Sequence, residues 1–269
     1  MRCVEQINQT LYRLLAEDER VLLLGEDILD PYGGAFKATK GLSTAFPDRV
    51  LATPISEATI VGVAGGLALE GFRPVVELMF GDFLGLTFDQ LLNYVTKYAL
   101  MFQGGVQCPL VVRTPMGGRR GYGPTHSQSI EKHFVGIPGL EVLALSQVHP
   151  IDAMLRYAVL ESDGPTLLIE NKRLYGAAIL PTGRGKIGEH IVVEDGLEDP
   201  RGSVVLSLAP EEVPDITIVT YGDSLNEVMQ ASETLLIEEE LVSEIVVLGS
   251  LSPLLLDATI RSLRRSGRL

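Results

Sequence analysis

Residues 53–83 read TPISEATIVGVAGGLALEGFRPVVELMFGDF, and this stretch contains a helix start, a small-residue helix and a buried strand. Ser56 is a typical N-cap residue, and Glu57 falls in the first turn, where a carboxylate complements the helix dipole. Apolar residues recur up to Gly71, which predicts a helix over 57–69. The apolar run that follows predicts a buried strand. We therefore expect one carboxylate at the start of a helix that packs into an α/β core.

Small residues are frequent in the predicted helix, at Gly62, Ala64, Gly65, Gly66 and Ala68. Glycine lowers helix stability by about 1 kcal/mol relative to alanine, so this composition is typical of a site where another backbone approaches closely. We therefore expect tight packing at an interface between chains. Taken alone, Glu57 is more simply interpreted as an acid that complements the helix dipole and contributes about 0.3–1 kcal/mol.

Apolar runs typical of buried strands alternate with helical segments along the first part of the chain. The predicted strands cover residues 21–25, 74–80, 109–113, 140–145 and 165–170. The other predicted helices cover residues 87–102 and 150–161. This alternation indicates an α/β fold with a mostly parallel sheet and helices on both faces. Ligands of such folds bind at the carboxyl ends of the strands.

Composition changes near residue 181 and again near residue 215. Residues 1–180 are expected to form one domain, and the Gly-, Pro- and acid-rich residues 181–214 are expected to form a linker with one hairpin. Residues 215–269 again show a strand, a helix, a strand and a helix, with the helices expected over 224–240 and 254–265. We expect a second, partial α/β domain there.

The charge and cysteine content exclude several classes of function. A net charge of −13 argues against nucleic acid or an anionic membrane as a partner, because both require clustered cations. Cys3 and Cys108 are the two cysteines, and their spacing predicts neither a disulfide framework nor a zinc site. No stretch is long and apolar enough to span a bilayer. A reducing cytoplasmic location is expected.

Six motifs occur in a fixed order: the segment quoted above, FDQLLN, RTPMGG, GPTHSQSIE, PGLEVLALS and ENKRLYG. Together they resemble the beta subunit of thiamine-diphosphate-dependent 2-oxo acid dehydrogenases, the decarboxylating components that act on pyruvate, branched-chain 2-oxo acids or acetoin. The resemblance is close over residues 4–176 and weaker beyond. It implies a thiamine-diphosphate-binding fold with a pyrimidine-type domain, followed by a transketolase C-terminal-like domain that is shorter here than in the family, as expected of a truncation.

The resemblance assigns roles to residues around the quoted segment. Glu57 would hydrogen-bond the aminopyrimidine ring of thiamine diphosphate and so promote loss of the thiazolium proton. Phe83 would stack on the pyrimidine, and Ile55 and Met79 would line the same pocket. His126 would assist at the reacting carbon during reductive acylation. An isolated loop histidine is more often a surface or capping residue, but the motif THSQSIE favours the catalytic interpretation.

The same resemblance implies further ligands and partners. Magnesium and the diphosphate would be held by an alpha subunit, because the motif GDG with its paired asparagines does not occur in this sequence. The family pattern predicts a complex of two alpha and two beta subunits that passes its acyl group to a lipoyl acyltransferase. Some members hold a structural potassium ion, and the matching positions here are Leu110, Ala158, Val159, Glu161 and Asp163.

Two other functions stay open at the level of sequence. One is the C-terminal half of a split transketolase, because that family uses the same pyrimidine-binding architecture and a similar helix led by glutamate. The other is a truncated paralogue that binds partners without catalysis. The motifs HSQS and LYG favour the dehydrogenase, and the retention of Glu57 and His126 argues against the paralogue.

Overall fold

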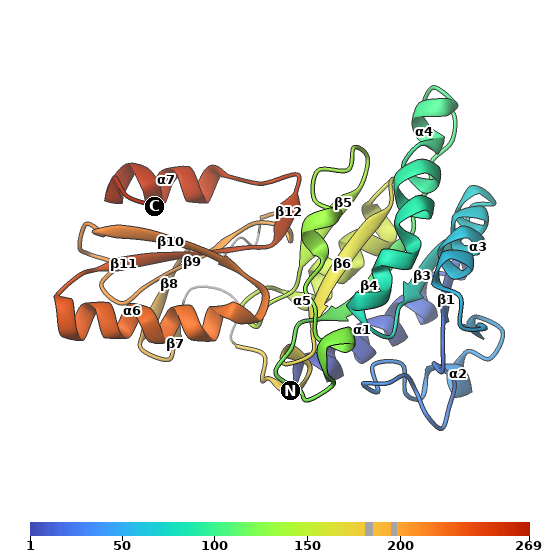
Figure 1. Ribbon diagram of the computed structural model, residues 1–269, viewed down its shortest axis with the longest axis horizontal. Helices are drawn as coiled ribbons and strands as arrows, with labels where there is room; N and C mark the ends of the chain where they lie inside the picture. Colours follow the sequence, from blue (N-terminus) through green and yellow to red (C-terminus); the bar gives the residue numbers. More distant parts are fainter. Residues whose placement is uncertain (181–184, 195–197) are drawn as a thin grey trace.

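A seven-stranded sheet forms the centre of the larger of two structural units (Figure 1). The computed structural model describes residues 1–180, 185–194 and 198–269. The strand order is β12-β5-β6-β4-β3-β1-β2, and every pair is parallel except β12 with β5. The strands are β1 (Val21–Gly25), β2 (Val50–Ala52), β3 (Arg73–Glu77), β4 (Val111–Met116), β5 (Glu141–Ala144), β6 (Thr166–Asn171) and β12 (Ser250–Ser252). The prediction of a mostly parallel sheet is confirmed.

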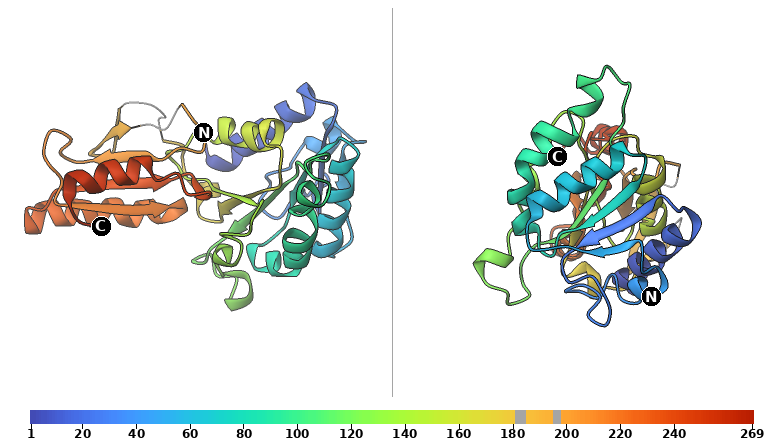
Figure 2. Two further views of the ribbon diagram at one scale, coloured as in Figure 1. Left: turned by 90° about the horizontal axis from the view of Figure 1, so that it is seen from above. Right: turned by 90° about the vertical axis from the view of Figure 1, so that its right-hand side faces the viewer.

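Both faces of this sheet are buried, as the continuous apolar strands predict. Val21 and Leu23 of β1 belong to one core cluster, whereas Leu22 and Leu24 belong to the other. The helices of this unit are α1 (Cys3–Glu17), α2 (Leu42–Ala45), α3 (Glu57–Leu69), α4 (Tyr98–Met101) and α5 (Ile151–Arg156). In Figure 2, α1 and α5 lie side by side on one face and α3 lies on the other. Among the described residues, no helix has the length and apolar character that crossing a bilayer requires.

The helix predicted over 87–102 is interrupted in the structure. It consists of a π-helical turn, Gln90–Val95, followed by the short α4. The hydroxyl of Thr96 donates to the carbonyl oxygens of Leu91 and Leu92 at 2.8 and 3.0 Å, which widens the backbone spacing at this point. The helix predicted over 150–161 likewise ends in a π-helical turn, Tyr157–Glu161.

A five-stranded sheet with the order β10-β11-β9-β8-β7 forms the second unit. Its elements are β7 (Lys186–Ile187), β8 (His190–Glu194), β9 (Val204–Ser207), β10 (Ile216–Tyr221), α6 (Leu225–Glu239), β11 (Ser243–Leu248) and α7 (Asp257–Ser266). The two helices cover opposite faces of the sheet (Figure 1).

The segment 181–214, predicted as a linker, instead supplies β7, β8 and β9 to this sheet where it is described. Residues 181–184 and 195–197 of that segment lie outside the described residues. These strands are short, and β9 pairs with β11, which lies far along the chain. β7 and β8 pair with each other as the expected hairpin, whereas the distant partner of β9 is absent from the local pattern on which the linker prediction relied.

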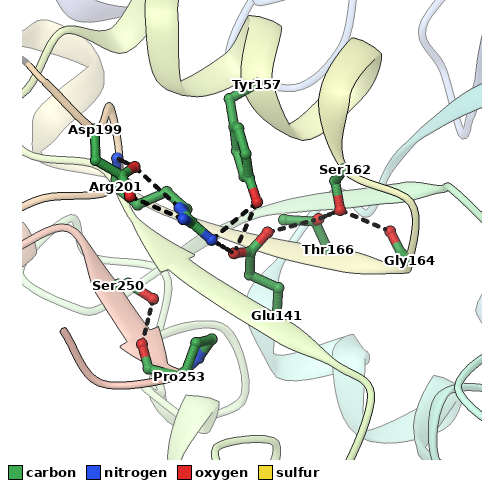
Figure 3. Close-up of polar contacts among 9 residues, drawn as sticks. All are labelled: Glu141, Tyr157, Ser162, Gly164, Thr166, Asp199, Arg201, Ser250 and Pro253. Atoms are coloured by element: carbon green, nitrogen blue, oxygen red, sulfur yellow. Dashed lines mark hydrogen bonds and ion pairs between the residues drawn. The ribbon is translucent and has the colours of Figure 1, made fainter.

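A cluster of charged and hydroxyl groups joins the two units (Figure 3). Arg201 donates to the Glu141 carboxylate at 3.0 Å and to the Tyr157 hydroxyl at 2.9 Å, and Asp199 accepts two further bonds from the same guanidinium. Glu141 lies on β5 and Tyr157 follows α5, so the loop before β9 is fixed to the larger unit. The pairing of β12 with β5 is a second connection between the units.

His149 provides a third connection and predicts a pH dependence of stability. Its Nε2 donates to the Gly202 carbonyl at 3.2 Å, its Nδ1 accepts from Ser146, and burial lowers its pKa to about 4. The unfolded chain binds a proton near pH 6.5 that the folded chain excludes, so stability is full above that pH and falls as the pH drops toward 4. We expect this contribution to fall by about 1.4 kcal/mol per pH unit in that window.

Urea unfolding of wild type and His149→Asn between pH 7 and pH 4.5 measures this contribution as a difference between the two proteins. The free energy of unfolding should fall less steeply with decreasing pH in His149→Asn than in the wild type. His133 is exposed, so His133→Asn should follow the wild type. Parallel curves for wild type and His149→Asn would show that His149 is not the proton-excluding group.

Candidate active site

The predicted site residues follow the carboxyl ends of neighbouring strands. Glu57 begins α3 after β2, Met79 and Phe83 follow β3, and His126 lies in the loop after β4. The strands β2, β1, β3 and β4 are adjacent in the sheet, and all are parallel. The fold therefore brings four residues that are up to about 70 positions apart to one edge of the sheet, where ligands bind in open α/β folds.

Glu57 is buried, with 5% of its surface exposed, and its carboxylate accepts no hydrogen bond from any residue that the structure describes. Ser56 occupies the N-cap position as predicted, but its hydroxyl bonds the Thr59 hydroxyl at 2.8 Å rather than the helix backbone. Unlike Glu26 Oε1, neither oxygen of Glu57 is fully enclosed, so a group outside the chain can reach it. Glu57 is thus available to a donor from outside the chain, which the dipole interpretation does not require.

A second carboxylate, Glu26, lies close to Glu57 and was missed in the sequence. It follows β1, is 6% exposed, and its Oε1 atom has no hydrogen-bond partner among the described residues. Burial, together with the negative charge of Glu57, raises the pKa of the Glu26 carboxyl. The available signal was the acid in GED directly after the buried strand VLLLG, at the expected edge of a parallel sheet.

Aromatic rings surround His126. The imidazole meets Phe80 edge-on at 4.8 Å and Phe83 edge-on at 5.2 Å between ring centroids, and its Nδ1 lies 2.9 Å from the Thr125 hydroxyl. Phe80 also contacts Tyr122 at 5.5 Å. The structure therefore brings together Phe83 and His126, which the sequence placed in separate motifs, and it adds Phe80 as the ring between the two loops.

The other predicted pocket residues are less enclosed. Ile55 is 82% exposed, and the Met79 side chain is partly buried. Four cavities over the described residues are lined by other side chains than Ile55, Glu57, Met79, Phe83 and His126. These five residues combine a buried acceptor, apolar side chains and an imidazole, which is the chemistry of one wall of a site.

The positions predicted for potassium are held by hydrogen bonds within the chain. Arg73 donates to the carbonyl oxygens of Val159 and Ser162 at 3.2 and 2.7 Å, and the Leu110 carbonyl accepts from the Thr166 amide. Glu161 and Asp163 are exposed, while Ala158 is buried. A guanidinium beside these carbonyls repels a second cation. The contacts favour a hydrogen-bonded loop over an ion site, and potassium stays a prediction.

A metal site built from His, Cys, Asp and Glu side chains is also absent from the described residues. Over residues 1–180, 185–194 and 198–269, no group of three or more His, Cys, Asp and Glu side chains is arranged to hold a metal ion. The two cysteines are buried and unpaired, and burial raises the pKa of the Cys3 thiol to about 11 and that of Cys108 to about 12. Both thiols are therefore protonated near neutral pH and poor metal ligands.

Comparison with known proteins identifies relatives over the whole chain. The family described as "Transketolase, pyrimidine binding domain" matches residues 1–177. The beta subunit of acetoin:2,6-dichlorophenolindophenol oxidoreductase from Cupriavidus necator is 36% identical, over 98% of this chain and 76% of the relative. The beta subunit of 3-methyl-2-oxobutanoate dehydrogenase from Mycobacterium tuberculosis is 36% identical, over 98% of this chain and 72% of the relative.

A third relative and one solved structure extend the comparison. The beta subunit of the pyruvate dehydrogenase E1 component from Leifsonia xyli is 35% identical, over 99% of this chain and 74% of the relative. Among solved structures, a split-gene transketolase described as an inactive beta4 tetramer superimposes with a TM-score of 0.71 at 22% identity, over 98% of this chain and 75% of that one. At 22% identity the solved structure shows a shared fold alone, whereas the relatives at 35–36% identity show the family.

Proposed function

The chain belongs to the family of 2-oxo acid dehydrogenase beta subunits, which contain a transketolase-type pyrimidine-binding domain, and we propose that it takes part in oxidative decarboxylation of a 2-oxo acid. The observation that carries the proposal is the Glu57 carboxylate. It is buried, lacks a hydrogen-bond partner among the described residues, and lies at the sheet edge that also holds Phe83 and His126. A structural acid at a helix start would need none of these neighbours.

Each side chain then has a distinct task. When bound, thiamine diphosphate supplies the electron sink for decarboxylation. Glu57 would hydrogen-bond the aminopyrimidine ring and so favour the imino tautomer that removes the thiazolium proton. Phe83 provides the apolar surface for a flat ring, with Met79 and Ile55 beside it. His126 is held by Phe80 and Phe83 and serves the later transfer of the acyl group to a lipoyl acyltransferase.

An alpha subunit completes the site under this proposal. The sequence has no motif for the diphosphate or for magnesium, and Ile55, one of the predicted pocket residues, is 82% exposed. The outer face of α3 is also apolar and small: Val63 is 50% exposed, Leu69 is 37% exposed, and a methyl group added at Gly66 would meet nothing within 4 Å. Exposed apolar surface of this kind marks a contact with another chain.

Substitution of Gly66 tests where the partner binds. Gly66→Leu should fold normally, because the added side chain points into open space and leucine favours the helix. We expect it to lower co-purification of the alpha subunit at least tenfold, because close backbone approach is no longer possible. Gly176→Leu is the matched control, since that glycine is also exposed with open space around it. Equal co-purification of both variants would place the interface elsewhere.

The reaction itself is tested with a panel of substrates. The chain is co-expressed with an alpha-type partner, and the complex is assayed with thiamine diphosphate and magnesium on pyruvate, 3-methyl-2-oxobutanoate and acetoin. Turnover of one of these names the substrate class. Ketol transfer between sugar phosphates, with no 2-oxo acid decarboxylation, would instead favour the split transketolase. The two-alpha, two-beta stoichiometry, the cytoplasmic location and the potassium ion remain predictions for the purified complex.

A further inference from the structure

Lys172 is a buried lysine that the roles described above do not use. It follows β6, its side chain is fully buried, and its Nζ donates to the Gly117 carbonyl at 2.9 Å. The same nitrogen lies 3.9 Å from Asp82 Oδ2 and 5.3 Å from the centre of the Phe80 ring. Burial lowers the pKa of this ammonium, and the charge of Asp82 acts in the opposite direction. A buried lysine is rare unless a carboxylate pairs with it.

Asp82 in turn holds the loop that carries His126. Its Oδ1 accepts from both the backbone amide and the side-chain amide of Gln128, at 3.1 and 2.9 Å. Its Oδ2 is buried and makes no hydrogen bond among the described residues, so Lys172 is its nearest recorded cation. Without that cation, a buried carboxylate would be left with one uncompensated oxygen.

Lys172 also fixes the other end of the same loop. The Gly117 carbonyl accepts from Lys172, while the Gly117 amide donates to the Gln128 carbonyl at 3.1 Å and closes the base of the loop. Gly117 has a φ of +86°, and a side chain there would clash with Asn171. One ammonium thus contacts the first residue of the loop and, through Asp82, the last.

We propose that Lys172 is a positioning residue for His126 and acts through Asp82 and Gln128 on the loop 117–128. The role of His126 in this proposal rests on the proposed function. The loop holds the imidazole against Phe80 and Phe83, and the Lys172 ammonium lies 5.3 Å from the centre of the Phe80 ring. Removing the ammonium releases both ends of the loop at once. Misplacement of a catalytic group by about 1 Å lowers rates by about a hundredfold.

Hydrogen exchange on the full chain is the first test, because it does not depend on catalysis. The hydrogen-bonded amides of Gly117, His126 and Gln128 should exchange at least tenfold faster in Lys172→Met and in Asp82→Asn, and the double variant should not exceed the larger single effect. Lys132→Met is the matched control, because Lys132 is exposed, and should exchange as the wild type does. Unchanged exchange in both single variants overturns the proposal, and Asp82→Asn tests it if Lys172→Met does not fold.

The assembled complex gives a second readout that a purely structural role would not move. Lys172→Met should lower kcat for acyl transfer to the lipoyl group about 10- to 100-fold with the KM for the 2-oxo acid unchanged, and this loss should vanish in a His126→Asn background. An equal loss in that background overturns the proposal. A wild-type complex without any turnover would instead count against the proposed function, while the exchange experiment would still decide the link between Lys172 and the loop.

Discussion

Glu57→Gln is expected to reduce turnover of the assembled complex by about 10²- to 10⁴-fold, the range that general acid–base groups contribute. Glutamine keeps the shape of the side chain but cannot share a proton with the aminopyrimidine ring as a carboxyl group does. The chain should remain folded, since the dipole contribution of a first-turn acid is only about 0.3–1 kcal/mol. Steady-state decarboxylation of the 2-oxo acid, measured at saturating thiamine diphosphate, gives the loss in kcat.

The first-turn acid of α7 provides the control for this variant. Asp257 is exposed and occupies the same helix position as Glu57, so Asp257→Asn removes the same dipole interaction far from the site. Its turnover should equal that of the wild type. If Glu57→Gln also retained full turnover, Glu57 would be a structural acid and the assignment of this sheet edge as the site would fail.

Arg113→Met should produce the largest loss of stability. Arg113 on β4 is 1% exposed and forms ion pairs with two buried carboxylates, Glu77 on β3 and Glu170 on β6. Its Nε and Nη2 donate to the two oxygens of Glu170 at 2.9 and 2.8 Å, and Tyr175 also bonds Glu170. Methionine would leave two buried carboxylates without a cation, and we expect a loss of about 3–5 kcal/mol in the free energy of unfolding.

An exposed ion pair supplies the comparison for Arg113. Arg13 pairs with Asp152 at 2.8 Å, but the two side chains are 46% and 37% exposed. Arg13→Met should therefore change the free energy of unfolding by less than about 1 kcal/mol. Both variants are measured by urea unfolding at pH 7. A loss in Arg113→Met no larger than that of Arg13→Met would show that water or protonation compensates the buried carboxylates.

Local patterns were sufficient where one face of an element is decided by its own residues. The helix predicted over 57–69 is α3 with the same bounds, and the strand VLLLG is β1 at 21–25. In both, the apolar spacing and the flanking polar residues are local signals. The helix predicted over 87–102 is interrupted in the structure. There the Thr96 hydroxyl bonds the carbonyl oxygens of Leu91 and Leu92, a contact that the apolar spacing does not reveal.

Pairing and side-chain contacts across the sheet could not be predicted in this way. The strand β9 pairs with the distant β11, and β12 leaves the second unit to pair with β5. At the proposed site, motif order pointed to Glu57, Phe83 and His126, but not to Glu26 or to the contacts from Lys172 through Asp82 to Gln128. Those groups are separated widely along the sequence, and only the strand order places them together.

We propose that this chain contributes one wall of a shared thiamine diphosphate site, and a comparison of three preparations tests this proposal. Thiamine-diphosphate-dependent decarboxylation of a 2-oxo acid is measured for the chain alone, for the alpha-type partner alone and for the two together. Turnover is expected only when this chain and the alpha-type partner are combined. Full turnover by either chain alone would contradict it.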